Sequence, residues 1–389
     1  MTSTAPNDAP LPALFQPFAV RGTRFRNRIV LTPMCQYASE DGHVSPWHFD
    51  HHARFATGGV GGALVESTGV TRDGRITPSC LGIYLDAHID GLSRIVDIYH
   101  RHGVPVGIQL SHSGRKGSAA SPRDGAQPLV EGRADEAWEA VAPSAVALTP
   151  DWPVPRALGG EEIATLIDEF ALAARRAVRA GFDFVEIHGA HGYLVHSFVS
   201  PLSNRRNDEW GGDIAGRSRF AVKIAEAIRR VIPPDMPLFY RASAVDGVEG
   251  GLEIEDTVEL ARRLKAVGVD VIDCSSGGIT GASGRSYQRP SPGYLVPYAQ
   301  QVREQADMPT MAVGLIVNPQ QANAIIASGQ ADLVAMGRQL IAEPAFPFHA
   351  AEALGHPDPA EVLPESYAFF LRRRPPEQTR LDPDESGGS

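Results

Sequence analysis

Short apolar, β-branched runs alternate along the whole chain with longer segments in which apolar residues recur at helical spacing. Several of the short runs are almost continuously apolar, which is typical of strands covered on both faces. Eight such strands are predicted, at residues 27–34, 62–68, 104–111, 184–189, 237–242, 269–275, 310–315 and 332–337.

The segments between the strands have the spacing and punctuation of helices. Clear examples are residues 161–179, 217–231, 254–267 and 319–328. Asn318 followed by Pro319 is typical of a helix start, and a glycine between helix and strand is typical of a helix end. Eight βα units of this kind predict an α/β fold, the (β/α)8 TIM barrel, with a doubly wound open sheet as the alternative.

Two irregular segments interrupt this rhythm. Residues 113–159 follow the third strand and contain several prolines, and we expect them to form a lid over the barrel mouth. Residues 191–216 follow the fourth strand. We therefore expect a tail at 1–14, one barrel domain at 15–360 with an insertion at about 113–159, and a C-terminal arm and tail at 361–389.

The bulk composition narrows the function only by exclusion. A net charge of −10 argues against a nucleic-acid surface. Three widely spaced cysteines without a CxxC pair indicate a reducing compartment. The N-terminus lacks the pattern of a signal peptide, and no apolar run reaches the roughly 18 residues of a membrane helix. A cytoplasmic protein without a membrane or nucleic-acid partner is expected.

Catalytic groups of such barrels lie at the C-terminal ends of the strands and in the loops that follow. The residues delivered there are Thr32, Pro33, Met34, Cys35, Tyr37, Ser67, Gln109, His188, His191, Tyr193, Arg241, Gly314, Gly337 and Arg338. Gly314, Gly337 and Arg338 end the last two strands, where these barrels often bind phosphate. The alternative for these three is two strand-to-helix turns and a surface ion pair.

The run HGAHGY, residues 188–193, has three interpretations. It can be a polar turn satisfied by the backbone. It can hold a metal, although no carboxylate cluster accompanies the histidines, so no metal is expected. In the third interpretation two imidazoles hold one carbonyl oxygen while Tyr193 supplies a proton.

Five segments resemble the old yellow enzyme family of NADH:flavin oxidoreductases. They are NRIVLTPMCQY (27–37), GRITP (74–78), IQLSHSGRK (108–116), EIHGAHGYLVHSFVSPLSNRRNDEWGG (186–212) and MGR (336–338). The fourth segment is long and highly specific. Cys35 and the pair of histidines point to the bacterial branch that includes YqjM and the xenobiotic reductases, because yeast-like members generally carry threonine and a His–Asn pair.

The resemblance implies FMN as cofactor and gives the strand-end residues roles. Residues 32–35 and Ser67 would line the isoalloxazine, Gln109 and Arg241 would face its pyrimidine end, and Gly314, Gly337 and Arg338 would take the phosphate. No G-x-G-x-x-G fingerprint is present. NADPH or NADH would therefore reach the same open flavin face as the substrate, in ping-pong turnover.

The implied reaction is reduction of the C=C bond of an α,β-unsaturated carbonyl or nitro compound. Hydride passes from flavin N5 to the β-carbon, His188 and His191 hydrogen-bond the developing oxyanion, and Tyr193 protonates the α-carbon. Tyr37 would add a hydrogen bond to the oxygen. Cys35 would touch the substrate and tune the flavin potential, with an inert buried thiol as the alternative.

The segment SYAFFLRRR (366–374) resembles the arm with which this branch enters a neighbouring subunit's site. Phe370 and Arg373 are the matching residues, and a solvated basic tail is the alternative. A homodimer or a dimer of dimers is expected. The competing functions are a flavin reductase acting mainly on nitro-compounds, nitrate esters or quinones and, from another class, a metal-dependent barrel hydrolase.

Overall fold

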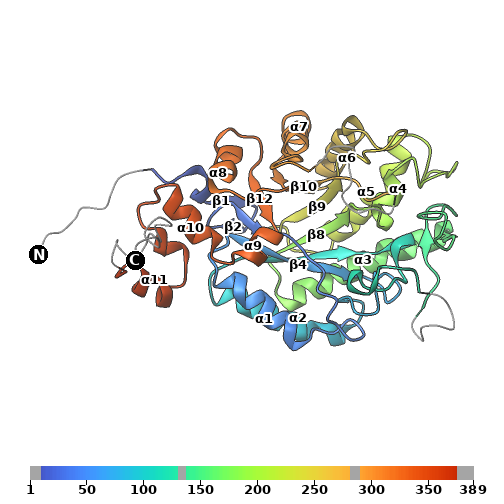
Figure 1. Cartoon of the computed structure of the whole chain (residues 1–389). Coiled ribbons are helices and arrows are strands. Elements are labelled where there is room, and N and C mark those ends of the chain that lie inside the picture. The colour runs from blue at the N-terminus through green and yellow to red at the C-terminus, as the bar shows by residue number, and fades with distance from the viewer. Residues whose placement is uncertain (1–9, 130–136, 281–289, 375–389) are drawn as a thin grey trace, which may run out of the picture.

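Eight parallel strands close into a barrel in the order β10-β11-β12-β3-β4-β5-β8-β9. The computed structural model describes residues 10–129, 137–280 and 290–374. The barrel strands are β3 (Ile29–Leu31), β4 (Gly62–Gly69), β5 (Val106–Ser111), β8 (Phe184–Gly189), β9 (Leu238–Ser243), β10 (Val271–Ser275), β11 (Thr310–Ala312) and β12 (Leu333–Met336). All eight predicted strands are present, and the predicted (β/α)8 fold is confirmed (Figure 1).

Two strands end three residues earlier than the sequence predicted, for backbone reasons. The first ends at Leu31, and Pro33 further along has no N–H to continue a ladder. The seventh ends at Ala312 because Gly314 and Leu315 have φ values of +116° and +50°, which are not extended.

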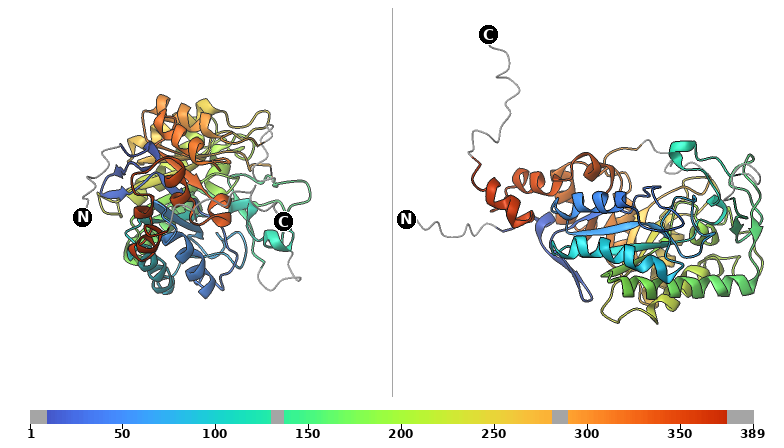
Figure 2. Two further views of the ribbon diagram at one scale, coloured as in Figure 1. Left: turned by 60° about the vertical axis from the view of Figure 1, so that its left-hand side comes forward. Right: turned by 90° about the horizontal axis from the view of Figure 1, so that it is seen from below.

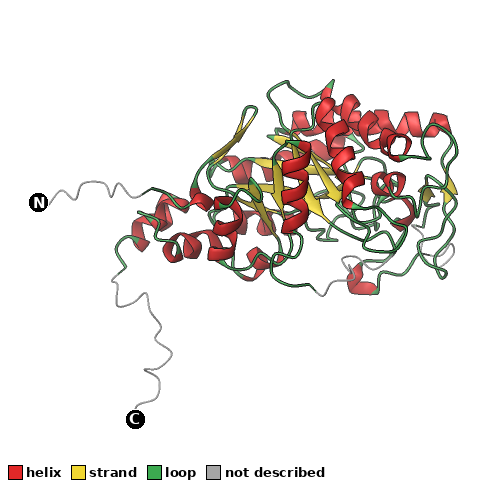
Figure 3. Cartoon of the chain, turned by 90° about the horizontal axis from the view of Figure 1, so that it is seen from above, coloured by secondary structure: helices red, strands yellow, loops and turns green. Residues whose placement is uncertain are grey.

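Helices surround the barrel, as Figure 3 shows in red around the yellow strands. They are α1 (Pro46–Ala56), α2 (Ile89–His100), α3 (Gly160–Ala180), α4 (Leu194–Val199), α5 (Ile214–Arg229), α6 (Ile254–Ala266), α7 (Val296–Ala306), α8 (Pro319–Ala327), α9 (Arg338–Ala342), α10 (Phe346–Ala353) and α11 (Glu365–Leu371). The predicted ends are confirmed: the Asn318 side chain accepts a hydrogen bond from the Gln321 N–H at 2.9 Å, and Gly181 follows α3 with φ of +92°.

An N-terminal hairpin of β1 (Phe18–Val20) and β2 (Thr23–Phe25) closes the end of the barrel where the strands begin. The buried ring of Phe25 lies 5.6 Å from that of Phe184 and 6.3 Å from that of Phe239. Strands of three residues are too short to show an alternating pattern, so the hairpin was not predicted.

The long segment after β5 has little regular structure. It contains two 3₁₀ turns and a two-stranded sheet, namely η3 (Gly114–Lys116), η4 (Pro122–Asp124), β6 (Val141–Ala142) and β7 (Arg156–Ala157). The segment after β8 is less irregular than expected, because it opens with the short helix α4. Three further 3₁₀ turns lie elsewhere, η1 (Ala13–Phe15), η2 (Asp86–His88) and η5 (Pro359–Val362).

The termini lie partly outside the described residues, which exclude 1–9 and 375–389. Within the described part of the chain, no helix is long and apolar enough to cross a membrane. Helix α11 lies at the end of the molecule opposite the segment that follows β5, as Figure 1 and the right-hand view of Figure 2 show.

Candidate active site

The strand ends bring distant residues into direct contact. Nη1 of Arg241, on β9, donates a hydrogen bond of 2.7 Å to Oγ1 of Thr32, which follows β3. The same Nη1 lies 3.1 Å from Oδ2 of Asp273 on β10, and both side chains are buried. Arg241 therefore carries a fixed positive charge at the mouth of the barrel.

A second buried acid lies beside this arginine. Oε1 of Glu186 accepts a hydrogen bond of 2.8 Å from Nε2 of Gln109 on the neighbouring strand. Burial, together with the charge of Asp273, raises the pKa of Glu186 to about 8. Asp273 and Glu186 were not predicted as site residues. The sequence signal that could have identified them is that each is an acidic residue inside an otherwise apolar strand.

The rings of the HGAHGY run converge as the third interpretation requires. His188 is the penultimate residue of β8, and its ring centroid lies 5.2 Å from that of His191 and 4.9 Å from that of Tyr193, edge to face in both cases. Nε2 of His191 lies 2.7 Å from the hydroxyl of Ser275 at the end of β10. We call His188, His191 and Tyr193 the clamp.

Both imidazoles of the clamp are neutral at neutral pH. Burial, with the positive charge of Arg241 as the next cause, places the pKa values of His188 and His191 well below the ordinary value. Nδ1 of His188 accepts a hydrogen bond of 3.3 Å from the Ala190 N–H, so the ring proton is on Nε2. His188 therefore presents a neutral N–H donor.

The phenol of the clamp and the neighbouring side chains of Tyr37 and Cys35 all keep their protons at neutral pH. Burial raises the pKa of Tyr193, and the neighbouring Cys35 and Tyr37 raise it further. Burial likewise raises the pKa of Tyr37, which hydrogen-bonds the Cys35 side chain. The thiol of Cys80, which was not predicted as a site residue, hydrogen-bonds Cys35 and with burial raises the pKa of Cys35.

Lys116 was also not predicted. Its Nζ donates hydrogen bonds to the carbonyl oxygens of His191, at 2.8 Å, and Gly278, at 3.2 Å, and lies 5.2 Å from the centroid of the Tyr193 ring. Burial lowers the pKa of Lys116 to about 8. It lies in the IQLSHSGRK segment, where a lysine on a turn looks like an ordinary surface residue.

The remaining predicted residues also lie at strand ends. Ser67 is opposite Gln109 in the β4–β5 register, after an irregularity in β4. A Cβ at Gly337 would lie 2.9 Å from Sδ of Met34 and from Cγ2 of Thr32, so β12 ends against the loop after β3.

Arg338 begins α9 directly after Gly337 and is exposed. Among the described residues it has no hydrogen-bond or ion-pair partner. Gly314, one strand earlier, has φ of +116°, a conformation that side chains other than hydrogen rarely allow. The exposed guanidinium of Arg338 leaves this rim of the barrel accessible to a ligand, whereas a Cβ at Gly314 would lie 3.0 Å from the Leu295 side chain.

Phe370 and Arg373 are not part of this cluster. Phe370 lies on α11 with 71% of its surface exposed, and the Arg373 guanidinium stacks on Phe369 at 3.5 Å from the ring centroid. Their predicted contribution to a site would have to be made in another subunit.

Comparison with known proteins agrees with this geometry. Residues 13–356 match the family described as NADH:flavin oxidoreductase / NADH oxidase. The NADPH dehydrogenase of Geobacillus sp. (strain WCH70) is 44% identical over 344 residues, which are 88% of this chain and 94% of that protein. The NADPH dehydrogenase of Bacillus subtilis (strain 168) is 41% identical over 351 residues, 90% of this chain and 97% of that protein.

Solved structures show the same relationship. Morphinone reductase superposes with a TM-score of 0.73 at 25% identity, covering 90% of this chain and 91% of its own. An old yellow enzyme homologue from Zymomonas mobilis superposes with a TM-score of 0.72 at 27% identity. The match covers 92% of this chain and 99% of that homologue. The chain therefore belongs to the NADH:flavin oxidoreductase / NADH oxidase family, as an FMN-dependent, NAD(P)H-oxidising enzyme of the old yellow enzyme type.

Proposed function

We propose that this enzyme is an ene-reductase, which uses NAD(P)H to reduce the C=C bond of α,β-unsaturated carbonyl or nitro compounds. The observation that carries the proposal is the clamp: two neutral imidazoles and a protonated phenol with ring centroids about 5 Å apart. Two donors for one oxygen and a nearby acid are the groups that conjugate reduction needs.

The residues at the strand ends fit FMN. Nε of Arg241 is buried without a hydrogen-bond partner among the described residues, and an acceptor from the flavin would satisfy it. The exposed guanidinium of Arg338 suits the phosphate, and Gly314 and Gly337 would bring backbone N–H groups close to it. Thr32, Pro33, Met34, Cys35 and Ser67 would line the ring system, with Gln109 beside Arg241.

When bound, FMN would supply the redox chemistry of the reaction, which is hydride transfer between the nicotinamide and the β-carbon of the substrate. His188 Nε2–H donates to the substrate oxygen as negative charge develops there. When the Ser275 hydroxyl donates to Nε2 of His191, Nδ1 of His191 carries the proton and becomes the second donor. Each donor of this kind contributes roughly 3 kcal/mol to the transition state.

Tyr193 then delivers a proton to the α-carbon, and its raised pKa keeps that proton available at neutral pH. Tyr37 adds a hydrogen bond to the substrate oxygen. Cys35 contacts the substrate as a neutral thiol, because its raised pKa excludes a thiolate at neutral pH. The structurally similar morphinone reductase has been solved with tetrahydroNAD, which supports a nicotinamide visiting the same site.

We further propose that two chains associate through the C-terminal arm, so that Phe370 and Arg373 reach a neighbouring site. Three large aromatic side chains on α11 support this, because Tyr367, Phe369 and Phe370 are 53%, 45% and 71% exposed. Clusters of exposed apolar side chains commonly mark interfaces.

The test is an anaerobic two-step experiment on the purified holoenzyme. NADPH should bleach the flavin, and 2-cyclohexenone should then restore its colour within seconds while yielding cyclohexanone. A reduced enzyme that reacts with a nitrate ester or a quinone, but not with the enone, contradicts the proposal.

A further inference from the structure

The turn that carries the clamp has an uncommon backbone. His191 has φ of +60°, in the left-handed region that residues other than glycine rarely adopt, and Gly192 follows with φ of +77°. Two contacts hold His191: its N–H donates to Oγ of Ser243 at 2.9 Å, and its carbonyl accepts from Nζ of Lys116. The next N–H, of Gly192, donates to Nδ1 of His196 at 2.8 Å.

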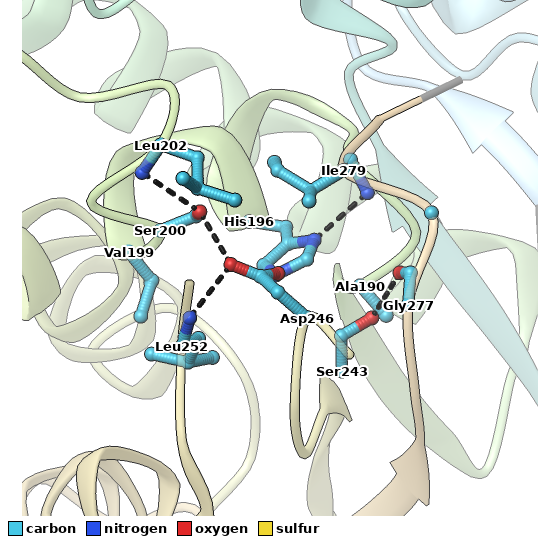
Figure 4. A network of polar contacts seen from close by, with 12 residues as sticks. Ala190, His196, Val199, Ser200, Leu202, Ser243, Asp246, Leu252, Gly277 and Ile279 are labelled. Atoms are coloured by element: carbon cyan, nitrogen blue, oxygen red, sulfur yellow. Dashed lines mark hydrogen bonds and ion pairs between the residues drawn. The ribbon is translucent and has the colours of Figure 1, made fainter. Parts of the chain in front are cut away.

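His196 is a buried residue of α4, with 1% of its surface exposed. Its Nε2 lies 3.0 Å from Oδ1 of Asp246, in the loop after β9 (Figure 4). Both atoms are buried, and neither has a hydrogen-bond partner in the described part of the chain, so this 3.0 Å approach is the polar contact that each of them makes. Because Nδ1 accepts a hydrogen bond, it bears no proton in the neutral ring, and the ring proton is on Nε2, facing Asp246.

The other carboxylate oxygen of Asp246 accepts two hydrogen bonds. Oδ2 accepts hydrogen bonds from Oγ of Ser200 at 2.6 Å and from the Leu252 N–H at 2.8 Å, and Figure 4 shows both partners converging on it. Burial favours the neutral acid, but His196 and these donors hold the pKa of Asp246 below its ordinary value. Asp246 is therefore an ionised acceptor held in one orientation.

We propose that Asp246 and His196 are a positioning pair for the clamp. The carboxylate fixes the Nε2–H tautomer of His196, so that Nδ1 accepts from the Gly192 N–H and the turn presents His191 and Tyr193 correctly. This inference rests on the proposed function in that the clamp binds the substrate oxygen. The two residues touch neither substrate nor flavin and act through the turn.

Asp246→Asn tests the tautomer without a change in size. Ser200 and Leu252 both donate, so the amide oxygen must occupy the Oδ2 position and the NH₂ group must face His196. Nε2 of His196 then has to accept, and its proton moves to Nδ1, where it opposes the Gly192 N–H. Two donors that face each other in a buried site disrupt the turn.

His196→Asn separates the two halves of the argument. An asparagine oxygen lies near the position of the histidine Nδ1 and still accepts from the Gly192 N–H, but it does not reach Asp246. If Asp246 acts only through His196, then Asp246→Asn has no further effect on ligand binding in the His196→Asn background. Such a double-mutant cycle isolates the coupling between the two residues.

The readout is the affinity of the FMN holoenzyme for 4-hydroxybenzaldehyde, titrated by flavin absorbance, with the melting temperature measured alongside. We expect Asp246→Asn to weaken binding about tenfold or more in the wild type and less than about twofold in His196→Asn. Thr257→Val is the matched control: it removes a buried 2.9 Å hydrogen bond to Ala244 in the same loop without touching His196. It should lower the melting temperature and keep the affinity.

The outcomes are distinct. A wild-type holoenzyme that fails to bind the phenol overturns the clamp, and with it the positioning pair. A wild type that binds, with Asp246→Asn binding equally well or with equal losses in both backgrounds, overturns the pair alone. If Asp246→Asn does not fold, ¹⁵N NMR of the wild-type histidines decides, with His196 identified by His196→Asn: protonated Nε2 and bare Nδ1 support the pair, and the reverse tautomer contradicts it.

Discussion

The ring of Tyr193 meets the ring of His188 edge to face, with centroids 4.9 Å apart and planes at 79°. His188 is the penultimate residue of β8, whereas Tyr193 directly precedes α4, so the conformation of the strand-to-helix turn sets the distance between the two rings. In the proposed reaction, an oxygen held by His188 would leave the carbon two bonds away near the phenol, so oxygen binding and proton delivery would depend on different residues.

Tyr193→Phe tests this separation. The variant keeps the ring against His188 and loses only the acid, so the oxidative half-reaction with 2-cyclohexenone should slow by about 10²- to 10⁴-fold. Reduction of the flavin by NADPH needs no proton from this residue and should change less than about threefold. Stopped-flow measurement of the two half-reactions checks this, and an equal loss in both would show that Tyr193 has another role.

The geometry of the turn predicts a contrast between two glycines. Gly192 and Gly212 have nearly the same φ, +77° and +76°, but a Cβ at Gly192 would lie 2.3 Å from the carbonyl oxygen of Gly278, whereas one at Gly212 meets nothing within 4 Å. Gly212→Ala should cost only the left-handed strain, about 1–2 kcal/mol of unfolding free energy. Gly192→Ala should lower the unfolding free energy further and should also weaken phenol binding by about tenfold or more.

Denaturant unfolding and phenol titration of the two holoenzyme variants check this contrast. Because the nearest atom at Gly192 is backbone, no side chain can move aside to relieve the contact. Equal stability and equal affinity of the two variants would mean that the turn is not held as tightly as its contacts indicate.

The barrel was predictable because strands that are buried on both faces appear in the sequence as largely apolar runs. Residues 106–111 and 184–189 are entirely buried, and both were visible as apolar runs. The clamp was predictable for a different reason, because His188 and Tyr193 lie within six residues of each other and carry a specific motif.

Contacts between residues that are far apart in the sequence could not be predicted in this way, because no local pattern indicates them. Asp246 lies 50 residues beyond His196, and nothing in the intervening chain indicates that the two side chains meet. Lys116 has the sequence context of a surface lysine, and its burial depends on how the segment after β5 folds over the turn. Such residues are visible only when the fold brings the loops together.

The buried acid beside Arg241 predicts a pH dependence of stability. In the folded state Glu186 has a pKa of about 8, raised above its unfolded value mainly by burial. A raised pKa means that the contribution of Glu186 is fully present below about pH 4.5 and is lost as the pH rises toward 8. Between pH 5 and 7 the unfolding free energy of the wild type should fall by at most about 1.4 kcal/mol per pH unit because of this group.

Glu186→Gln should remove that slope, because the amide keeps an acceptor for Nε2 of Gln109 but cannot ionise. Unfolding free energies of apo and holo forms at several pH values between 5 and 8 measure it. Glu161→Gln, an exposed residue of α3 with the same change in charge, is the control. Parallel profiles for wild type and Glu186→Gln would contradict the raised pKa.

The exposed aromatic face of α11 predicts how copies of the chain meet. Helix α11, which carries the exposed residues Phe369 and Phe370, lies at the end of the molecule opposite the segment after β5 (Figure 2). If α11 enters a neighbouring site, the double variant Phe369→Ala/Phe370→Ala should lower the mass measured by light scattering and raise the KM for the enone several-fold.

Val154→Ala is the control, because it shortens another apolar side chain that is 66% exposed, and it should change neither the mass nor the KM. A double variant with unchanged mass and KM would indicate that α11 faces solvent, and a lower mass with unchanged KM would indicate an interface that contributes nothing to the site.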